Sequence, residues 1–219
     1  MELTFTNGEP QALGTIFCVG RNYAAHIEEL GNQRPEEPLI FTKPATALNT
    51  SDTIVLPSFS QDIHYETEIV VLIGKGGKNI AAEDTEQHIG GWGIGLDLTA
   101  RDKQTQLKNQ GASWELAKGF DGAACVSEFL DADAFKLDEA ILFSLTVNDE
   151  TRQQGNSQMM LFPIAEQIAF LSQYFTLRRG DILFTGTPKG VGKLHPNDEL
   201  NLVLGNQQIC KHYRVATHE

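Results

Sequence analysis

The sequence is poor in cysteine and in positive charge. Its 219 residues include three cysteines, Cys18, Cys125 and Cys210, which are widely spaced and form no Cys-x-x-Cys motif. Scattered cysteines in odd number predict small buried residues in a reducing compartment rather than a disulfide framework. Lysine and arginine number 17 against 29 aspartates and glutamates, and the longest basic run is the pair Arg178-Arg179. Because binding to a nucleic-acid backbone requires clustered cations, we expect no nucleic-acid partner.

Long hydrophobic runs and nucleotide-binding motifs are also missing. No apolar run approaches the ~20 residues that a membrane-spanning helix needs. The first ten residues, MELTFTNGEP, have neither the basic nor the apolar region of a secretory signal. The segment GKGGK (74–78) lacks the GxxxxGK[ST] spacing of a phosphate-binding loop, and it follows an apolar strand as a turn. We therefore expect a soluble cytoplasmic protein with no membrane partner.

Length and turn signals bound the fold. The chain is long enough for one sizeable core, and we predict a single domain over residues 1–219. Short apolar strands with hairpin signals, such as Asn148-Asp149-Glu150 and Gly205-Asn206, outnumber segments of helical periodicity. The clearest helix is LFPIAEQIAFLSQYF (161–175), where Pro163 suits a first turn. This pattern favours a β-rich fold, either closed or layered.

The stretch HYETEIVVLIG (64–74) places two acids at the start of an apolar run. Residues i and i+2 of a strand project from the same face, so a strand would aim Glu66 and Glu68 at one point. The apolar residues that follow favour burial, and buried like charges need a cation between them. Mg²⁺ prefers such oxygen ligands, and Asp97 in GWGIGLDLTARD offers a third carboxylate. The alternative is an edge strand whose acids face solvent.

A second candidate site lies on a predicted helix, YAAHIEEL (23–30). His26 and Glu29 are three residues apart, so they face the same way on a helix. The glutamate could hold the imidazole and raise its basicity, as a general base requires. The alternative is a surface helix that carries a solvated histidine among acids. The polar segment after Gly31-Asn32 predicts a mobile loop that could serve as a lid.

Several motifs occur in an order that resembles the fumarylacetoacetate hydrolase family, especially its short single-domain bacterial members and their acylpyruvate-hydrolase relatives. They are CVGRNYAAHIEELG, PLIFTKPATAL, HYETEIVVLIG, GIGLDLTARDKQ, WELAKGFD, VNDETRQQGN and GDILFTGTPKGVG. The resemblance covers the chain from about Gly14 to its end. It implies an α+β, mainly β fold, the mixed β-sandwich roll of the fumarylacetoacetate hydrolase C-terminal domain. It also implies a homodimer.

The resemblance assigns roles to eight residues. By similarity, the ligands of Mg²⁺ (or Mn²⁺) are Glu66, Glu68 and Asp97, the catalytic residues are His26, Glu29 and Lys118, and the substrate-binding residues are Gln104 and Thr187. The chain departs from the family pattern after KGFD, where it has GAACVSEFL instead of a segment with Pro and Gly, and at Lys103, where relatives often have an apolar residue. We expect an altered loop after KGFD and altered substrate selection, and we assign no effect to Lys103.

The resemblance implies an enzyme that acts on a small anionic 2-oxo acid. The first expectation is divalent-metal-dependent C–C bond hydrolysis of acylpyruvates (2,4-dioxo acids), giving pyruvate and a carboxylic acid. The alternatives are an oxaloacetate tautomerase or decarboxylase, and an isomerase or decarboxylase of aromatic ring-cleavage diacids. A non-catalytic metal-dependent binding protein of the same fold is a further alternative. The residues alone assign no role to Lys43, His64 or Arg21.

Overall fold

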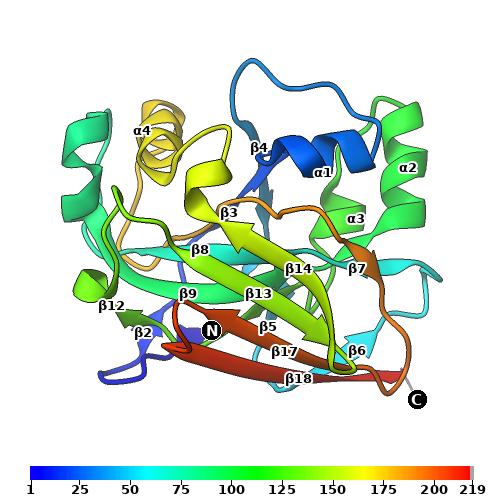
Figure 1. The fold of residues 1–219 in the computed structure, drawn as a ribbon. Coiled ribbons are helices and arrows are strands. Elements are labelled where there is room, and N and C mark those ends of the chain that lie inside the picture. Colours follow the sequence, from blue (N-terminus) through cyan, green and yellow to red (C-terminus); the bar gives the residue numbers. More distant parts are fainter. Residues whose placement is uncertain (218–219) are drawn as a thin grey trace.

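A computed structural model describes residues 1–217 of the chain, and within them the fold is mainly β with few α-helices. A large mixed sheet runs through the middle of the molecule (Figure 1). Its strands follow the order β4 (Leu39–Lys43), β3 (Ile16–Gly20), β15 (Ile182–Phe184), β8 (Thr67–Ile73), β9 (Ile89–Asp97), β11 (Ala124–Val126) and β5 (Leu48–Asn49), and β12 (Leu130–Asp131) also pairs with β9. The pairs β3–β15 and β5–β11 are parallel. The prediction of a mainly β, mixed roll is confirmed.

A second sheet packs against the first. Its order is β14 (Glu150–Asn156), β13 (Leu142–Val147), β17 (Glu199–Leu204), β18 (Ile209–Thr217) and β6 (Thr53–Leu56). Both predicted hairpins are present, and Asn148 and Asp149 have φ values of 50° and 65°, as a two-residue hairpin turn requires. Strand β13 lies against β8, and β17 and β18 lie against β9.

The core lies between these two sheets and beneath the helices. Strand β8 is buried along its whole length, and β9 buries Trp92, Ile94 and Leu96 completely. The apolar run after Glu68 is therefore buried on both faces, which excludes the edge-strand alternative. Helix α4 (Ile164–Tyr174) covers the other side of the large sheet and buries Ile168 and Leu171 (Figure 1). Pro163 precedes its first residue rather than lying within its first turn.

The stretch 64–74 is not one strand as predicted. It is divided at Glu66 into β7 (Ile63–Tyr65) and β8. Strand β7 pairs with β10 (Thr99–Ala100) and β16 (Gly192–Lys193) in a separate small sheet, whereas β8 belongs to the large one. A further two-stranded ribbon joins β1 (Glu2–Leu3) to β2 (Gln11–Ala12). The division places Glu66 at the junction of two sheets.

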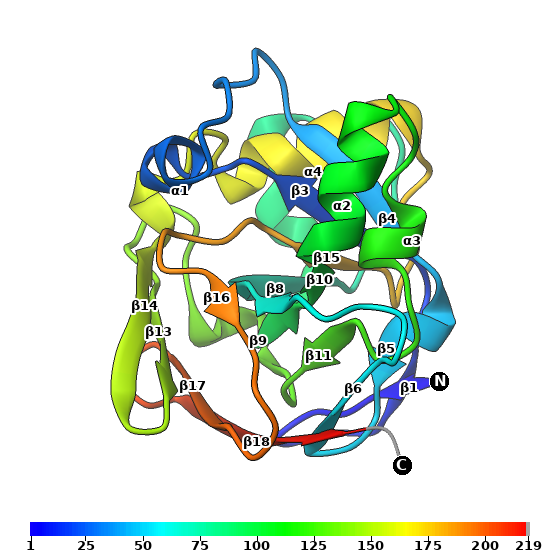
Figure 2. The ribbon, with the colours of Figure 1, turned by 90° about the vertical axis from the view of Figure 1, so that its right-hand side faces the viewer.

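Three short helices gather over that junction. Figure 2 shows α1 (Ala24–Glu29) on one side and α2 (Arg101–Asn109) and α3 (Glu115–Lys118) on the other, above β8, β10 and β16. Short 3₁₀ helices connect other elements, namely η1 (Ala45–Ala47), η2 (Ala82–His88), η3 (Ala132–Ala134) and η4 (Ser157–Met159). Within residues 1–217, the helices are too short or too polar for any of them to cross a membrane.

Candidate active site

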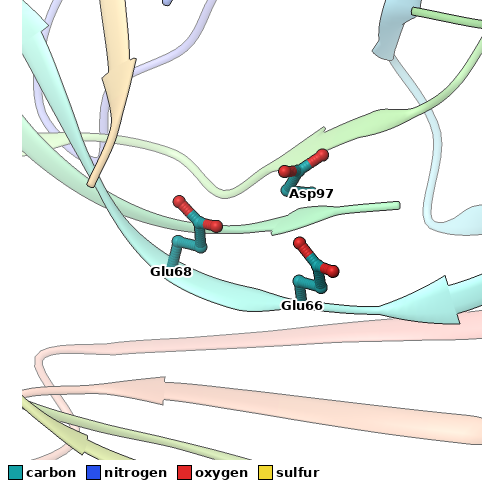
Figure 3. A group of neighbouring side chains, drawn as sticks. All are labelled: Glu66, Glu68 and Asp97. Atoms are coloured by element: carbon teal, nitrogen blue, oxygen red, sulfur yellow. The ribbon is translucent and has the colours of Figure 1, made fainter. Parts of the chain in front are cut away.

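Three carboxylates meet where β8 begins and β9 ends. Glu66, Glu68 and Asp97 each offer one oxygen, and these oxygens lie within 4.8 Å of one another. Figure 3 shows the three side chains converging, Glu66 and Glu68 from one strand segment and Asp97 from the neighbouring one. The predicted convergence is therefore present, although Glu66 lies outside β8. The backbone N–H of Asp97 donates to the Glu66 carbonyl at 2.8 Å, which extends the β8–β9 pairing to Glu66.

The three acids are buried, with 5 %, 2 % and 1 % of Glu66, Glu68 and Asp97 exposed. Burial raises the pKa of Glu68 well above its usual range, and the charges of Asp97 and Glu66 raise it further. The N–H of Gly186 donates to Glu68 Oε2 at 2.7 Å and opposes this shift. Gly186 has a φ of 103°, a left-handed conformation that favours glycine, so the turn can present its N–H to the carboxylate.

Buried cations contact the same acids. Lys118 Nζ donates to Glu66 Oε2 at 2.7 Å and to Asp97 Oδ2 at 2.5 Å. Arg101 forms an ion pair with the other oxygen of Glu66. Burial favours protonation of Glu66, but the charges of Lys118 and Arg101 hold its pKa well below the usual range. Lys118 thus lies beside the predicted metal ligands, as the resemblance implied, and Arg101 is an addition that the sequence did not suggest.

Lys43 is the second site residue that sequence reasoning missed. Its ammonium lies 2.7 Å from Asp97 Oδ1, and its side chain is fully buried. The ammonium donates hydrogen bonds to the backbone carbonyls of Leu98 (3.4 Å), Ala123 (2.9 Å) and Lys118. Asp97 Oδ1 consequently lies beside the positive charge of Lys43, but it accepts no hydrogen bond from any group within residues 1–217. This oxygen keeps a buried lone pair without a donor, which is costly unless another group uses it.

The residues present fit a divalent cation. Three buried carboxylates converge, and Asp97 Oδ1 has a lone pair to offer. Burial, with the charges of Asp97 and Glu66, raises the pKa of Glu68, and a cation bound beside it would oppose that rise. The donor set is entirely oxygen, which suits a hard ion such as Mg²⁺ or Mn²⁺. Glu66, Glu68 and Asp97 are therefore the residues that could hold it.

His26 is buried beside the acids rather than solvated. Helix α1 carries it as predicted, and its Nδ1 lies 3.3 Å from Glu29 Oε2. Only 5 % of His26 is exposed, so the surface-helix alternative is wrong. Glu29 raises the pKa of His26 as predicted, but burial lowers that pKa by more, so it lies below its ordinary value. The imidazole is therefore neutral at pH 7, which is the form that can accept a proton.

A cavity connects His26 with the acid cluster. Its wall includes Glu66, Lys118 and Gln104, and Gln104 accepts a hydrogen bond from Arg101 at 2.8 Å. Segment 31–38, predicted as a lid, is irregular, and its residue Asn32 also lines the cavity. The other lining residues named here come from α1, α2, α3 and the β7–β8 junction, so the cavity lies among these elements.

Thr187 lies beside the acids but is engaged within the protein. Its hydroxyl donates to the Thr67 carbonyl at 2.9 Å and accepts from Gln153 Nε2 at 2.8 Å. It therefore anchors the loop that carries Gly186. His64 Nε2 lies 3.0 Å from Asp62 Oδ1, so its hydrogen-bond partner is outside the acid cluster.

The structure also shows where the chain departs from the family pattern, at residues 122–130 and at Lys103. In 122–130, residues Ala124–Val126 form β11, whose Ala124 pairs with Asp97. The departure therefore lies partly in a strand beside an acid of the cluster. Lys103 is half-buried on α2, and its ammonium donates to Gln106 Oε1 at 3.1 Å.

Comparison with known families and proteins gives a consistent result. The family described as fumarylacetoacetate (FAA) hydrolase C-terminal matches residues 15–212. The chain is 42% identical over 196 residues to oxaloacetate tautomerase YcgM of Escherichia coli K12, covering 89% of this chain and 90% of that protein. It is 39% identical over 186 residues to the human mitochondrial oxaloacetate tautomerase FAHD1, covering 84% of each.

Solved structures share the fold over nearly the whole chain. Fumarylpyruvate hydrolase from Pseudomonas aeruginosa, in complex with Mn²⁺ and pyruvate, superposes with a TM-score of 0.94 at 34% identity, covering 100% of this chain and 96% of that one. A putative fumarylacetoacetate isomerase/hydrolase from Oleispira antarctica superposes with a TM-score of 0.92 at 42% identity, covering 100% of both chains.

Proposed function

Because the chain belongs to the fumarylacetoacetate hydrolase family, we propose that it is a divalent-metal-dependent enzyme that interconverts the enol and keto forms of oxaloacetate. The single observation that carries this proposal is the neutral, buried His26, held by Glu29 in the cavity that also opens on Glu66 and Lys118. Keto–enol interconversion needs one base and one stabiliser of negative oxygen, and these residues supply both. The choice of substrate is supported by relatives that carry the name oxaloacetate tautomerase. The sequence alone placed acylpyruvate hydrolysis before oxaloacetate tautomerisation, and the present proposal reverses that order.

A divalent cation held by Glu66, Glu68 and Asp97 would polarise the 2-oxo acid as a Lewis acid. Mg²⁺ and Mn²⁺ both suit the site, and a structural neighbour contains Mn²⁺.

The protein's own groups handle the proton and the charge. If Nδ1–H of His26 donates to Glu29, Nε2 is left with a lone pair. In the enol-to-keto direction, Nε2 would take the proton from the enol oxygen, and a proton would be returned to C3 of the substrate. Lys118, already within 2.7 Å of two carboxylate oxygens, would stabilise the negative charge that develops on the substrate oxygen. Gln104 and Arg101, which line the same cavity, would orient the substrate.

A second candidate is hydrolysis of a C–C bond in acylpyruvates. It is favoured by the structural similarity to a fumarylpyruvate hydrolase that contains pyruvate. In this reaction the neutral His26 would activate water for attack on the C4 carbonyl of a 2,4-dioxo acid, and pyruvate and a carboxylic acid would be released. The same residues would serve both reactions, so the geometry alone is compatible with either.

The test is a parallel assay of metal-stripped protein and of protein loaded with Mg²⁺ or Mn²⁺. Oxaloacetate and acetylpyruvate are the substrates, and the loss of enol absorbance and the release of pyruvate are followed separately. We expect metal-dependent loss of oxaloacetate enol absorbance without pyruvate. Metal-dependent pyruvate from acetylpyruvate would instead establish the hydrolase, and pyruvate from oxaloacetate would establish a decarboxylase. Inactivity on both substrates would refute the proposal.

A further inference from the structure

Two cations in the wall of the cavity do not contact the acid cluster. Arg21 follows β3, and Lys108 lies in the last turn of α2. Both line the cavity that contains His26 and Glu66. Two of the cluster's carboxylates, Glu66 and Asp97, already contact Lys43, Lys118 and Arg101. Arg21 and Lys108 are therefore additional positive charges in the cavity, although the chain as a whole has a net charge of −12.

Neither cation has an acidic partner in the part of the chain that the structure describes. Arg21 forms no ion pair or side-chain hydrogen bond within residues 1–217. Lys108 contacts neutral groups, at 3.4 Å from Asn32 Oδ1 and 5.5 Å from the centre of the Trp114 ring. Burial lowers the pKa of Lys108, and the charges of Arg21 and Arg101 lower it further. The cations therefore repel one another across a partly desolvated space, and a bound anion would relieve that repulsion.

The backbone holds Arg21 in a fixed and unfavourable conformation. Its φ is 57°, in the left-handed region where a residue with a Cβ is disfavoured. The next residue, Asn22, is completely buried, and its amide donates to the carbonyls of Phe162 and Thr185 at 3.1 and 2.8 Å. These bonds fix the backbone next to Arg21, which lines the cavity. Strain maintained in this way is typical of a functional position.

We propose that Arg21 and Lys108 bind the distal carboxylate of a dicarboxylic 2-oxo acid and so select diacids over monoacids. This inference rests on the proposed function, because it takes the 2-oxo carboxylate of the substrate to lie deeper, at the acid cluster. A monocarboxylic 2-oxo acid would leave both cations without an anion. A guanidinium and an ammonium on two different elements could hold one carboxylate from two sides.

The test compares two chelating 2-hydroxy acids that do not turn over, malate and 2-hydroxybutanoate, which differ only in the distal carboxylate. Calorimetric titration of the Mg²⁺-loaded protein should show malate binding about 10–100-fold more tightly, as expected for charge-assisted hydrogen bonds. In Arg21→Gln combined with Lys108→Gln this preference should vanish, while the affinity for 2-hydroxybutanoate stays within about 2-fold. Lys103→Gln, on the same helix but outside the wall of the cavity, is the matched control and should keep the preference.

Three outcomes would overturn the proposal. One is equal binding of both acids to the unmodified protein, and another is an unchanged preference in the double variant. The third is an equal loss of affinity for both acids, which would assign the cations to the shared 2-hydroxy acid group. Because binding is measured without turnover, failure of the oxaloacetate assay would refute the proposed function without deciding this question. If the enzyme is active, the double variant should also raise the KM for oxaloacetate about 10–100-fold, with a smaller change in kcat.

Discussion

The carboxylate of Glu29 accepts a hydrogen bond from the backbone N–H of Gly190, with nitrogen-to-oxygen distances of 3.0 and 3.2 Å to its two oxygens. The same carboxylate lies 3.3 Å from His26 Nδ1. Glu29 therefore fixes the imidazole and also ties α1 to the loop that carries Thr187. One side chain therefore positions both His26 and the loop at Gly190.

Substitution of Glu29 should impair turnover more than metal binding. In Glu29→Ala both contacts are lost, and we expect kcat to fall about 100-fold because a small displacement of a catalytic group is costly. Glu29→Gln keeps an acceptor for Gly190 and should lose less. Steady-state kinetics would be paired with calorimetric titration of Mg²⁺, whose affinity should stay the same. Glu28→Gln, exposed on the same helix, is the control, and an undiminished kcat in Glu29→Ala would remove Glu29 from the mechanism.

The pH dependence of the reaction should report His26. Burial lowers the pKa of His26 below its ordinary value of 6.5, so the neutral base persists to lower pH than an exposed histidine would. As pH falls through this lowered pKa the imidazole becomes protonated and cannot accept a proton. We therefore expect kcat/KM to be constant near pH 7 and to decline only below 6.5. His26→Gln should lower kcat about 10²–10⁴-fold and abolish this acid limb. Retention of the limb in the variant would assign it to another group.

The acid cluster could be predicted largely from the sequence. The i, i+2 spacing of Glu66 and Glu68 survives the break between β7 and β8, because the hydrogen bond from Asp97 N to Glu66 O continues the strand pairing. The hairpin turns were also predictable, since Asn148-Asp149 tolerates the positive φ that such a turn requires. The sheet order and the specific roll came from the resemblance, because residue patterns mark strands but do not say which of them pair.

The cations of the site could not be predicted in this way. Lys43 donates hydrogen bonds to the carbonyls of Lys118 and Ala123, and Arg101 forms an ion pair with Glu66. In each case the partners are far apart in the sequence. A lysine at the end of a strand and an arginine at the start of a helix look like surface residues until tertiary structure buries them. The lowered pKa of His26 was missed for the same reason, because burial depends on the whole fold.

Lys43 should matter to stability as well as to the site. Its ammonium is fully buried and contacts Asp97 and backbone carbonyls, so Lys43→Met would leave a buried carboxylate with less positive charge. Removing one partner of a buried ion pair typically costs about 3–5 kcal/mol, and we expect a loss of this size in the free energy of unfolding. Urea denaturation of the metal-free protein would measure it. Lys75→Met, at an exposed position, should change stability by less than about 0.5 kcal/mol. A similarly small effect at Lys43 would show that the buried charge is compensated elsewhere.

The cysteines should differ in reactivity by position. Burial raises the pKa of Cys125 to about 12 and that of Cys18 well above its usual range, whereas Cys210 is exposed. Because the thiolate is the reactive form, iodoacetamide at pH 8 should modify Cys210 first. Mass spectrometry should find one adduct on the folded protein and three after denaturation. Rapid labelling of Cys18 in the folded protein would contradict the packing around the acid cluster.

Asp97→Asn tests the metal site most directly. The substitution keeps the size of the side chain but removes the charge, and it can replace the donor-free Oδ1 with an N–H that repels a cation. We expect the Kd for Mg²⁺ or Mn²⁺ to rise at least about 100-fold by calorimetry, because a lost carboxylate ligand is a larger change than the loss of an outer partner. The unmodified protein should gain about 2.7 kcal/mol of stability when the metal is present at 100 times its Kd, and the variant should gain little. Glu83→Gln, which alters an exposed acid, should behave like the unmodified protein. If Asp97→Asn still bound metal at its original affinity, the three converging carboxylates would not be the metal site, and Lys118 would be left as the principal source of positive charge for the reaction.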